Sequence, residues 1–423
     1  MKQAYIICIC LLTFGLSTFN SSAQCNNGRY RDKIFGVSTN VQQQYGSAPK
    51  YDGSNQDLYM DIFQPSGDNF ARRPLIILAF GGSFTSGVRQ SPDILQLCND
   101  FAKRGFVTAT IDYRIGKENG DDTSMYKAVL RGIQDMNGAI RYFYKDVYTN
   151  NHYRIDTNQI YIGGTSAGAF IGLNKAYQNL NVYSRPVPQD FLLAFGAVGG
   201  PDGTNNPGYN SNVKGVIDLC GAVFDTIWMQ PGGPILVGVH GTADNTVSFY
   251  YDSALGAQDI KKRFFGGGDI INRMNHLGSS FTGYIYPFYG ADHAPFVLPI
   301  PLVPPASLYM DTTIQVLQDF LYAHTDCDST RIGQTGILDP DYHISVSALP
   351  NPADDILTVY SHEAEALQVE VYSIDGKLMQ SFDLAANGRH YIRKGELSAG
   401  MYILQYYDHT GTVKLRSDKI VFE

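Results

Sequence analysis

The chain of 423 residues has no excess of basic side chains. Lys and Arg together number 32, against 40 Asp and Glu, which gives a formal net charge of -8 at pH 7. Proteins that bind nucleic acid or anionic membrane surfaces need cationic side chains to neutralise phosphates. The charge balance therefore argues against those partners and against acidic polymers as substrates. With 44% hydrophobic and 17% charged residues, the composition is that of a folded globular protein.

The N-terminus lacks an apolar run long enough to span a bilayer. The apolar segment at 4–16 is shorter than the ~20 residues that a membrane-spanning helix needs. It follows the positive charge of Lys2, and the small residues Ser21 and Ala23 stand three and one positions before a potential cut. These features predict a secretory signal peptide at residues 1–23 and no stable membrane insertion.

Cysteines are few and widely spaced. Removal of the signal peptide leaves Cys25, Cys98, Cys220 and Cys327, of which no two lie two to four residues apart as zinc ligands usually do. In an oxidising compartment an even number of cysteines favours disulfides, and all three connectivities stay open. The sequence also has no HExxH motif, P-loop or dinucleotide fingerprint. We therefore expect neither a metal nor an organic cofactor.

Short apolar segments alternate with helical periodicity through the middle of the chain. The six segments with strand character are residues 74–80, 106–112, 159–163, 213–219, 235–240 and 282–288. Between the second and the third, a helical stripe recurs at spacings of four and three, formed by Val129, Ile133, Met136, Ile140 and Phe143. This alternation is typical of a largely parallel sheet covered on both faces by helices. We therefore predict the α/β class.

The sequence changes character near its C-terminus. Gly, Asp, Thr and Pro dominate residues 329–342, which predicts a linker after an α/β domain at 24–328. Beyond the linker, segments with period-two alternation are separated by turn signals such as Asp375-Gly376. We therefore predict a second, small all-β sandwich domain at 343–423.

This C-terminal domain resembles the sorting domain of the type IX secretion system. The residues that carry the resemblance are Pro350-Asn351-Pro352, Val371 to Lys377, Leu397 to Gly400 before Tyr402, and Lys419-Ile420-Val421. The resemblance implies that the type IX secretion machinery is a partner and that the protein reaches the cell surface or the medium through the periplasm. A fibronectin-like or carbohydrate-binding accessory module is the alternative.

The stretch GGTSAGA at residues 163–169 contains the pattern G-x-S-x-G. Chance supplies this pattern often enough that its context must decide. A predicted strand at 159–163 stands directly before it, and residues 167–176 have helix-forming character directly after it. A nucleophile elbow is such a strand, turn and helix, in which glycines permit a sharp turn and the serine hydroxyl projects above the sheet. Ser166 is therefore the candidate nucleophile.

Candidates for the general base and its orienting acid follow Ser166 in the chain. A serine hydroxyl is a weak nucleophile that needs a base, usually histidine, held by a carboxylate. Asp244 follows the predicted strand at 235–240, and His293 follows the one at 282–288. The order Ser, acid, His is that of α/β hydrolases. We predict that Asp244 is the acid and His293 the base.

Other acids and histidines fit these roles less well. Asp292 is adjacent to His293, and neighbouring side chains usually diverge. Asp218 lies within a predicted strand, where a buried structural role is expected. His240 belongs to the strand before Asp244, and we expect it to shape that loop.

Two glycines after the first predicted strand are candidates for an oxyanion hole. Gly81 and Gly82 occupy the place of the HGGG loop of lipases and esterases, although Phe80 stands where histidine is usual and Ser83 where a third glycine is common. Backbone N–H groups aimed at the developing oxyanion stabilise acyl-transfer transition states by several kcal/mol. We predict Gly82, Ser83 and Ala167 as donors, and a plain tight turn is the alternative.

Together these features resemble the α/β-hydrolase superfamily, most nearly the carboxylesterase and hormone-sensitive-lipase-like esterases. The residues that carry the resemblance are Leu58 to Pro65, Arg73-Pro74, Gly81-Gly82, Arg104-Gly105-Phe106, Asp112-Tyr113-Arg114, Gly164 to Gly168, and the loops of Asp244 and His293. The resemblance implies a secreted serine carboxylic-ester hydrolase that works through an acyl-enzyme. An acetyl or feruloyl esterase acting on polysaccharide, a prolyl-oligopeptidase-like peptidase and an inactive hydrolase-fold binding protein are the alternatives.

Two further segments are expected near the site. Asp112-Tyr113-Arg114 is expected to brace the loops around the oxyanion turn rather than to contact substrate. Residues 197–212 are rich in glycine and asparagine, and such a loop lines the active-site face, forms a lid or stays a plain solvent loop.

Overall fold

The computed structural model describes residues 28–179, 189–251 without 201 and 204, 264–297, 306–326 and, with short gaps, 346–422. The predicted signal peptide and the predicted linker lie outside the described residues, and so do Cys25 and Cys327. The limits proposed for the two domains therefore stay predictions.

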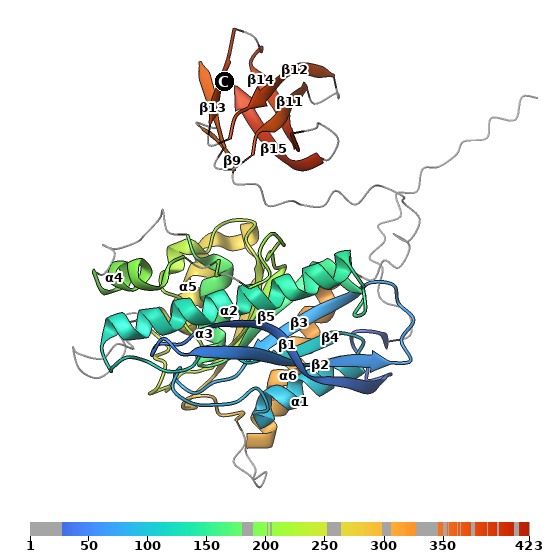
Figure 1. The fold of residues 1–423 in the computed structure, drawn as a ribbon. Coiled ribbons are helices and arrows are strands. Elements are labelled where there is room, and N and C mark those ends of the chain that lie inside the picture. The colour runs from blue at the N-terminus through green and yellow to red at the C-terminus, as the bar shows by residue number, and fades with distance from the viewer. Residues whose placement is uncertain are drawn as a thin grey trace, which may run out of the picture.

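An eight-stranded sheet forms the centre of the first domain (Figure 1). Its strands, in chain order, are β1 (Gly36–Pro49), β2 (Asn55–Ser66), β3 (Arg73–Ala79), β4 (Val107–Ile111), β5 (Ile155–Thr165), β6 (Gly215–Leu219), β7 (Ile235–Gly241) and β8 (Gly283–Phe288). Their order in the sheet is β1-β2-β4-β3-β5-β6-β7-β8. The six strands β3 to β8 are parallel to one another. In contrast, β2 is antiparallel to β4, and β1 is antiparallel to β2. The predicted α/β class is confirmed.

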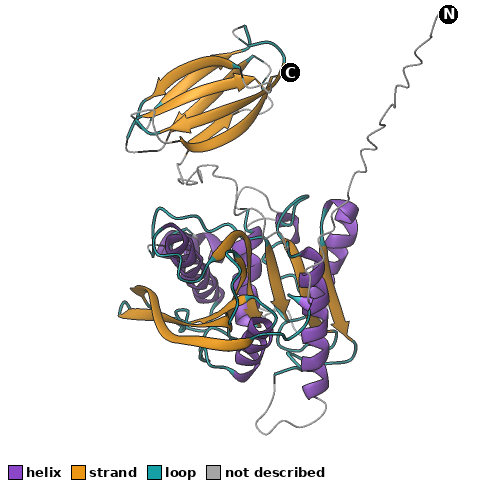
Figure 2. Ribbon diagram, turned by 90° about the vertical axis from the view of Figure 1, so that its right-hand side faces the viewer, coloured by secondary structure: helices purple, strands orange, loops and turns teal. Residues whose placement is uncertain are grey.

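Helices cover both faces of this sheet (Figure 2). They are α1 (Pro92–Lys103), α2 (Asp122–Tyr148), α3 (Ala167–Tyr177), α4 (Gln189–Val198), α5 (Gly267–Leu277) and α6 (Ala306–His324), with the short 3-10 helices η2 (Thr226–Trp228) and η4 (Gly278–Ser280). The helices α1 and α6 lie on one face and α2 and α3 on the other (Figure 1). Within the described ranges, no helix has both the length and the apolar character that crossing a bilayer requires.

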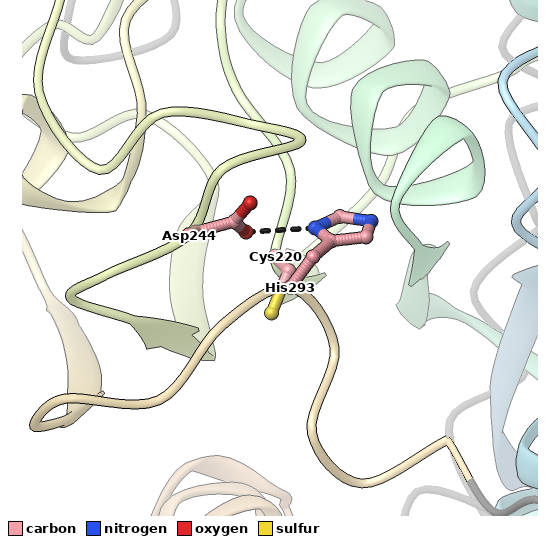
Figure 3. A group of neighbouring side chains, drawn as sticks. All are labelled: Cys220, Asp244 and His293. Carbon is pink, nitrogen blue, oxygen red and sulfur yellow. Dashed lines mark hydrogen bonds and ion pairs between the residues drawn. The ribbon is translucent and has the colours of Figure 1, made fainter. Parts of the chain in front are cut away.

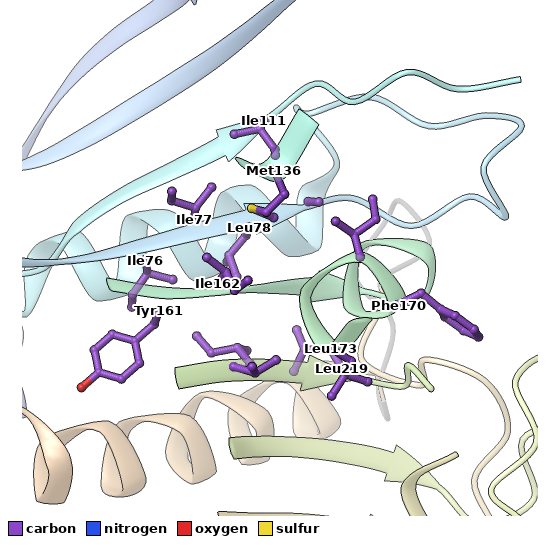
Figure 4. Close-up of a cluster of buried hydrophobic side chains, with 14 of the residues drawn as sticks. Ile76, Ile77, Leu78, Ile111, Met136, Tyr161, Ile162, Phe170, Leu173 and Leu219 are labelled. Carbon is purple, nitrogen blue, oxygen red and sulfur yellow. The ribbon is translucent and has the colours of Figure 1, made fainter. Parts of the chain in front are cut away.

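The core lies between the sheet and the helices that cover it (Figure 4). Every residue of β3 is buried, and the predicted stripe of α2 faces the same core, with Met136 and Ile140 fully buried. Burial of one large apolar side chain stabilises a fold by roughly 1.5–3 kcal/mol. A core of this extent holds the carboxyl ends of the parallel strands rigidly, and these ends carry the loops of the predicted site.

Strands β1 and β2 were not among the predicted segments. The amide-rich β1 is mostly exposed at the edge of the sheet, so it has no apolar alternation to reveal it. Its pairing with β2 is also irregular, because the register shifts between Asn40 and Gln43 and again between Gln44 and Gly46. A strand with a solvated face and bulges leaves little period-two signal in its sequence.

The C-terminal domain contains two antiparallel sheets with a common core (Figure 2). One has the order β13-β10-β9 and the other the order β12-β11-β14-β15. The strands are β9 (Val346–Leu349), β10 (Ile356–Ser361), β11 (Leu367–Ser373), β12 (Leu378–Leu384), β13 (Arg389–Arg393), β14 (Gly400–Tyr407) and β15 (Lys414–Phe422). Alternate residues of β11 and β14 are buried, as in two packed sheets. The predicted β-sandwich is confirmed.

The described cysteines correct the disulfide expectation. Cys98 in α1 and Cys220 after β6 are both buried and free. Burial raises the pKa of the Cys98 thiol to about 12. None of the three complete pairings therefore holds, because each of them includes these two residues.

Candidate active site

Ser166 occupies a strained turn between β5 and α3. Its backbone has φ 53° and ψ -113°, in a region that residues other than glycine rarely adopt. The Ser166 N–H donates to the Leu219 carbonyl at 2.8 Å, and the N–H of Phe170 donates to the Ser166 carbonyl at 2.9 Å. The sharp turn therefore ties the end of β5 to its neighbour β6 and to the first turn of α3.

The glycines around Ser166 are required by close backbone packing. A Cβ atom on Gly164 or on Gly168 would lie 1.9 or 2.0 Å from the Ala79 carbonyl oxygen, and one on Gly163 would lie 1.9 Å from the Ile217 carbonyl oxygen. Gly164 also has φ 151°, which favours glycine. The turn can form against β3 and β6 only when these positions have no side chain.

Gly168→Ala is therefore expected to lower the free energy of unfolding of the first domain by at least about 2 kcal/mol, because the obstacle is backbone that cannot move aside. Urea unfolding of the variant and of the unaltered chain measures the difference. Gly196→Ala in α4 is the matched control. Its Cβ meets nothing within 4 Å, so it is expected to raise stability by about 0.5–1 kcal/mol. Equal midpoints for the two variants would refute the packing argument.

The structure brings the three residues predicted as nucleophile, acid and base into one hydrogen-bonded row. Asp244 follows β7 and His293 follows β8, two strands whose carboxyl ends lie on the same sheet edge as that of β5. His293 Nδ1 lies 2.7 Å from Asp244 Oδ2, the pair drawn in Figure 3. His293 Nε2 lies 2.9 Å from Ser166 Oγ. The imidazole therefore bridges the carboxylate and the hydroxyl.

Asp244 is held by both of its carboxylate oxygens. Its side chain is fully buried, and Oδ1 accepts the backbone N–H groups of Thr246 at 2.8 Å and Val247 at 2.7 Å. Burial alone would raise its pKa, but hydrogen bonds from His240 and His293 outweigh burial and hold the pKa well below the ordinary value. The carboxylate is therefore ionised at neutral pH and aimed at His293.

His240 braces the Asp244 loop from beneath, as its place in β7 predicted. It is fully buried, and its Nε2 lies 3.0 Å from the Val247 carbonyl oxygen and 3.3 Å from Asp244 Oδ2. Burial acts to lower its pKa, while the hydrogen bond to Asp244 and the charge of Asp218 raise it to a value above the ordinary one. Asp218 lies within β6 and is fully buried, and burial raises its pKa to about 6.

Asp292 fixes the loops rather than the imidazole ring. Its Oδ1 accepts the backbone N–H groups of Asn245 at 2.9 Å and of His293 at 2.7 Å. The carboxylate thereby links the Asp244 loop to the His293 loop. Its Oδ1 atom holds main-chain N–H groups, whereas Asp244 holds the ring nitrogen of His293.

The Gly81-Gly82 turn runs beside Ser166. A Cβ on Gly81 would lie 3.3 Å from the Ser166 Cβ atom. Gly82 and Ser83 have positive φ values of 127° and 54°. Among the described residues, the backbone N–H groups of Gly82, Ser83 and Ala167 meet no acceptor. The three predicted oxyanion donors are thus uncommitted.

The Asp112-Tyr113-Arg114 segment braces this turn, as expected. The Tyr113 hydroxyl donates to the Phe80 carbonyl at 3.1 Å, and the two rings stack with centroids 4.4 Å apart. Arg114 in turn pairs with Asp135 of α2 at 2.9 Å, with both side chains buried. The segment therefore connects the start of the Gly-Gly turn to the helical layer.

Cys220 is a neighbour of the site that sequence reasoning did not identify. Its sulfur and the nearest ligand atoms of Asp244 and His293 lie within 4.8 Å of one another (Figure 3). Burial raises the pKa of the Cys220 thiol, so it stays protonated at neutral pH. A protonated thiol is a poor metal ligand, and Asp244 and His293 are hydrogen-bonded to each other. Cys220 therefore fits the role of a packing residue next to His293 rather than that of a metal ligand. The sequence signal that could have identified Cys220 is its position directly after β6.

The described part of the 197–212 loop is fixed to α2 and β1. Gln134 Nε2 donates to the Val198 and Gly200 carbonyl oxygens, and Asn206 Nδ2 donates to the Tyr45 carbonyl. These bonds hold the described residues of the loop against α2 and β1, and the roles predicted for the loop stay predictions.

Two family models match the chain. Residues 60–230 match the BD-FAE model, and residues 347–422 match the model of the secretion system C-terminal sorting domain. None of the curated proteins compared with the chain matches it.

Among solved structures, the chain is similar to esterase 2 of Thermogutta terrifontis in several states. The form phosphorylated by paraoxon is 20% identical with a TM-score of 0.44, over 68% of this chain and 94% of that one. The apo form is 21% identical with a TM-score of 0.45, over 69% and 96%. The butyrate-bound form is 21% identical with a TM-score of 0.45, over 70% and 96%.

The two family matches fall on different sheets of the structure. Residues 60–230 lie in the region of the eight-stranded sheet, and residues 347–422 lie in the region of the two smaller sheets. The chain carries an esterase-like α/β-hydrolase domain followed by a secretion system C-terminal sorting domain.

Proposed function

We propose that the protein is a secreted serine carboxylic-ester hydrolase in which Ser166, His293 and Asp244 form the catalytic triad. The observation that carries the proposal is the bridging imidazole, with 2.9 Å from Nε2 to Ser166 Oγ and 2.7 Å from Nδ1 to Asp244 Oδ2. Both distances lie within hydrogen-bond reach, as nucleophile activation by a general base requires.

In the proposed reaction Ser166 Oγ attacks the ester carbonyl carbon while its proton passes to His293 Nε2. The resulting tetrahedral intermediate collapses, the C–O bond to the alcohol breaks, and the imidazolium returns the proton to the leaving oxygen. A water molecule then attacks the acyl-enzyme with His293 again as base, which releases the acid and restores Ser166. Asp244 fixes the tautomer of the neutral imidazole and stabilises the imidazolium when it forms.

The oxyanion of the tetrahedral intermediate is assigned to the N–H groups of Gly82, Ser83 and Ala167. Ala167 is the first residue of α3, so the positive end of the helix dipole adds to its N–H. The bonds of Tyr113 to Phe80 support the geometry of the Gly-Gly turn. Donors that are fixed before the reaction need no reorganisation when the negative charge develops.

An ester is the favoured substrate class, and a polysaccharide-linked acetyl or feruloyl ester is the first specific candidate. The small residues around Ser166 are similar to those of esterases rather than of prolyl-oligopeptidase-like peptidases, and the BD-FAE match supports the ester reading. The sorting domain indicates export through the type IX system, which would bring the enzyme into contact with polymers outside the cell.

A substrate panel tests the proposal. The full chain and the Ser166→Ala variant are assayed on nitrophenyl esters of increasing chain length, acetylated xylan, feruloylated oligosaccharides and peptide anilides. We expect hydrolysis of esters by the unaltered chain only. Preferential cleavage of anilides would favour the peptidase alternative, and equal inertness of the two proteins towards every ester would favour a binding protein.

A further inference from the structure

A concave site lies at the end of the parallel strands opposite to Ser166. It is a pocket of about 510 Å³ between β1, the last turns of α2 and the segment before β5. Because β5 runs from Ile155 to Thr165 at about 3.3 Å per residue, its two ends lie roughly 30 Å apart. Ser166 is at the carboxyl end and this pocket is at the amino end. The proposed reaction uses none of its residues.

The pocket has the size of a ligand site and an unusual lining. Volumes of about 300–1,000 Å³ are typical of small-molecule sites. Six of the lining side chains are amides, namely Asn40, Gln43, Gln44, Gln64, Asn150 and Asn206. Four are rings, namely Tyr45, Tyr142, His152 and Tyr153. Amides both donate and accept hydrogen bonds. The N–H₂ groups of Asn40, Gln43, Gln44 and Asn206 already donate within the protein, so the lining offers neutral polar contacts through the amide oxygens and the remaining N–H groups, beside ring surfaces.

A bulge in β1 gives this edge of the pocket its amides. On a regular strand Asn40 and Gln43, three positions apart, would point to opposite faces of the sheet. The bulge between them, with Gln42 at φ 56°, lets both side chains line the same pocket. The Gln42 N–H donates to Asp61 Oδ1 at 2.8 Å, which fixes the bulge. Bulges commonly re-aim side chains in this way at functional sites.

Buried contacts hold the floor of the pocket in place. The fully buried guanidinium of Arg73 donates to Gln64 Oε1 at 2.8 Å and to the Tyr153 carbonyl at 2.6 Å. The Arg73 bond occupies the Gln64 side-chain oxygen, and the Gln64 N–H₂ group has no partner among the described residues. The Tyr153 hydroxyl accepts a bond from Asn40 Nδ2 at 3.0 Å. A site that is already ordered loses little entropy when a ligand binds.

The charges of the pocket are balanced. Asp146 is buried and accepts bonds from the backbone N–H groups of His152 and Tyr153, and it also contacts His152 Nδ1 at 3.1 Å. A committed carboxylate is a poor site for a further cation. The exposed Lys145 is the single Lys or Arg in the lining, so an anion finds few partners. The lining therefore favours an uncharged, hydrogen-bonding ligand.

We propose that this pocket binds a neutral oligosaccharide and anchors the enzyme on polysaccharide. Sugar hydroxyls pair with amide donors and acceptors, and the C–H face of a pyranose packs on the half-buried Tyr142 ring and the exposed His152 ring. The site does not depend on the triad. It supplies binding to the polymer, while the hydrolysis of soluble esters proceeds without it.

Binding of xylohexaose, cellohexaose and mannohexaose to the full chain with Ser166→Ala tests the proposal by calorimetry. We expect at least one of them to bind, and Tyr142→Ala and Gln43→Ala each to weaken that binding at least about tenfold. Tyr284→Ala, an exposed tyrosine on β8 that lies outside the pocket lining, is the matched control with less than a twofold effect.

Activity on a soluble nitrophenyl ester separates this proposal from the proposed function. Tyr142→Ala and Gln43→Ala in the chain with Ser166 intact are expected to keep that activity within twofold, which also shows that they fold. The proposal is overturned if none of the three oligosaccharides binds, or if binding survives both pocket substitutions unchanged. Ester hydrolysis could persist in either case, so the triad would stand without the pocket.

Discussion

Ser166→Ala is expected to lower kcat for ester hydrolysis by about 10⁶-fold with little change in KM. The hydroxyl oxygen is the atom that forms the acyl-enzyme, and the neighbouring His293 cannot replace it, because the ring is held between Ser166 and Asp244. Steady-state kinetics on a soluble nitrophenyl ester measure the loss. The variant keeps the backbone bonds of the turn, so circular dichroism and urea unfolding are expected to match the unaltered chain.

A double substitution provides the control for this expectation. His293→Ala should cost nearly as much as Ser166→Ala, and the two together should cost no more than either alone, because residues that act as one unit are strongly non-additive. Losses that multiply in the double variant would show that the two side chains act independently. That result would contradict the proposal that His293 and Ser166 act as base and nucleophile in the same step.

Asp244→Asn is expected to lower kcat about 10⁴-fold. An amide at this position can still accept the Thr246 and Val247 N–H groups, but it no longer supplies a negative charge to His293 Nδ1. The imidazolium of the transition state then loses its stabilising partner, and the tautomer that accepts the serine proton is no longer favoured. The rate on a soluble ester measures the effect.

Asp292→Asn is the matched control for the acid. Asn can keep its side-chain oxygen as acceptor for the two N–H groups that Asp292 now holds, so we expect less than about a tenfold loss. If Asp292→Asn costs as much as Asp244→Asn, then the orienting carboxylate is wrongly assigned.

The lowered pKa of Asp244 also predicts how the stability lost in Asp244→Asn depends on pH. Because the pKa is lower in the folded than in the unfolded protein, the ionised carboxylate contributes stability above the unfolded value of about 3.9, and this contribution is lost as the pH falls through the lower folded value. The stability difference between the unaltered chain and Asp244→Asn should therefore shrink below about pH 4. Urea unfolding at pH 7, 5 and 3.5 measures it.

The six strands predicted from the sequence all form. Five of them, β3 to β7, are largely buried in the sheet and therefore apolar along most of their length, whereas the edge strand β8 is only partly buried and is marked by its aromatic residues. Ser166, Asp244 and His293 could be found by their order and by their place after strands, since the carboxyl ends of parallel strands share one edge. Helix α1 and strands β1 and β2 were not predicted, and β1 has so many exposed amides that its pattern resembles a loop.

Two features that are assembled from distant segments without any recognisable motif could not be predicted. The amide-lined pocket combines β1, the end of α2 and Asn206, and no local motif connects these pieces. Cys220 approaches His293 only because β6 lies between β5 and β7 in the sheet. A single sequence holds no record of such proximity, which arises from strand order and loop packing.

Covalent labelling with a fluorophosphonate tests the central claim most directly. The full chain is treated with the probe, digested and analysed by mass spectrometry, beside Ser166→Ala and His293→Ala. We predict one adduct, on the peptide that contains Ser166, absent in Ser166→Ala and formed at a greatly reduced rate in His293→Ala. Ester hydrolysis by a chain that carries no adduct on Ser166, or an adduct on another serine that accompanies loss of activity, would contradict the account.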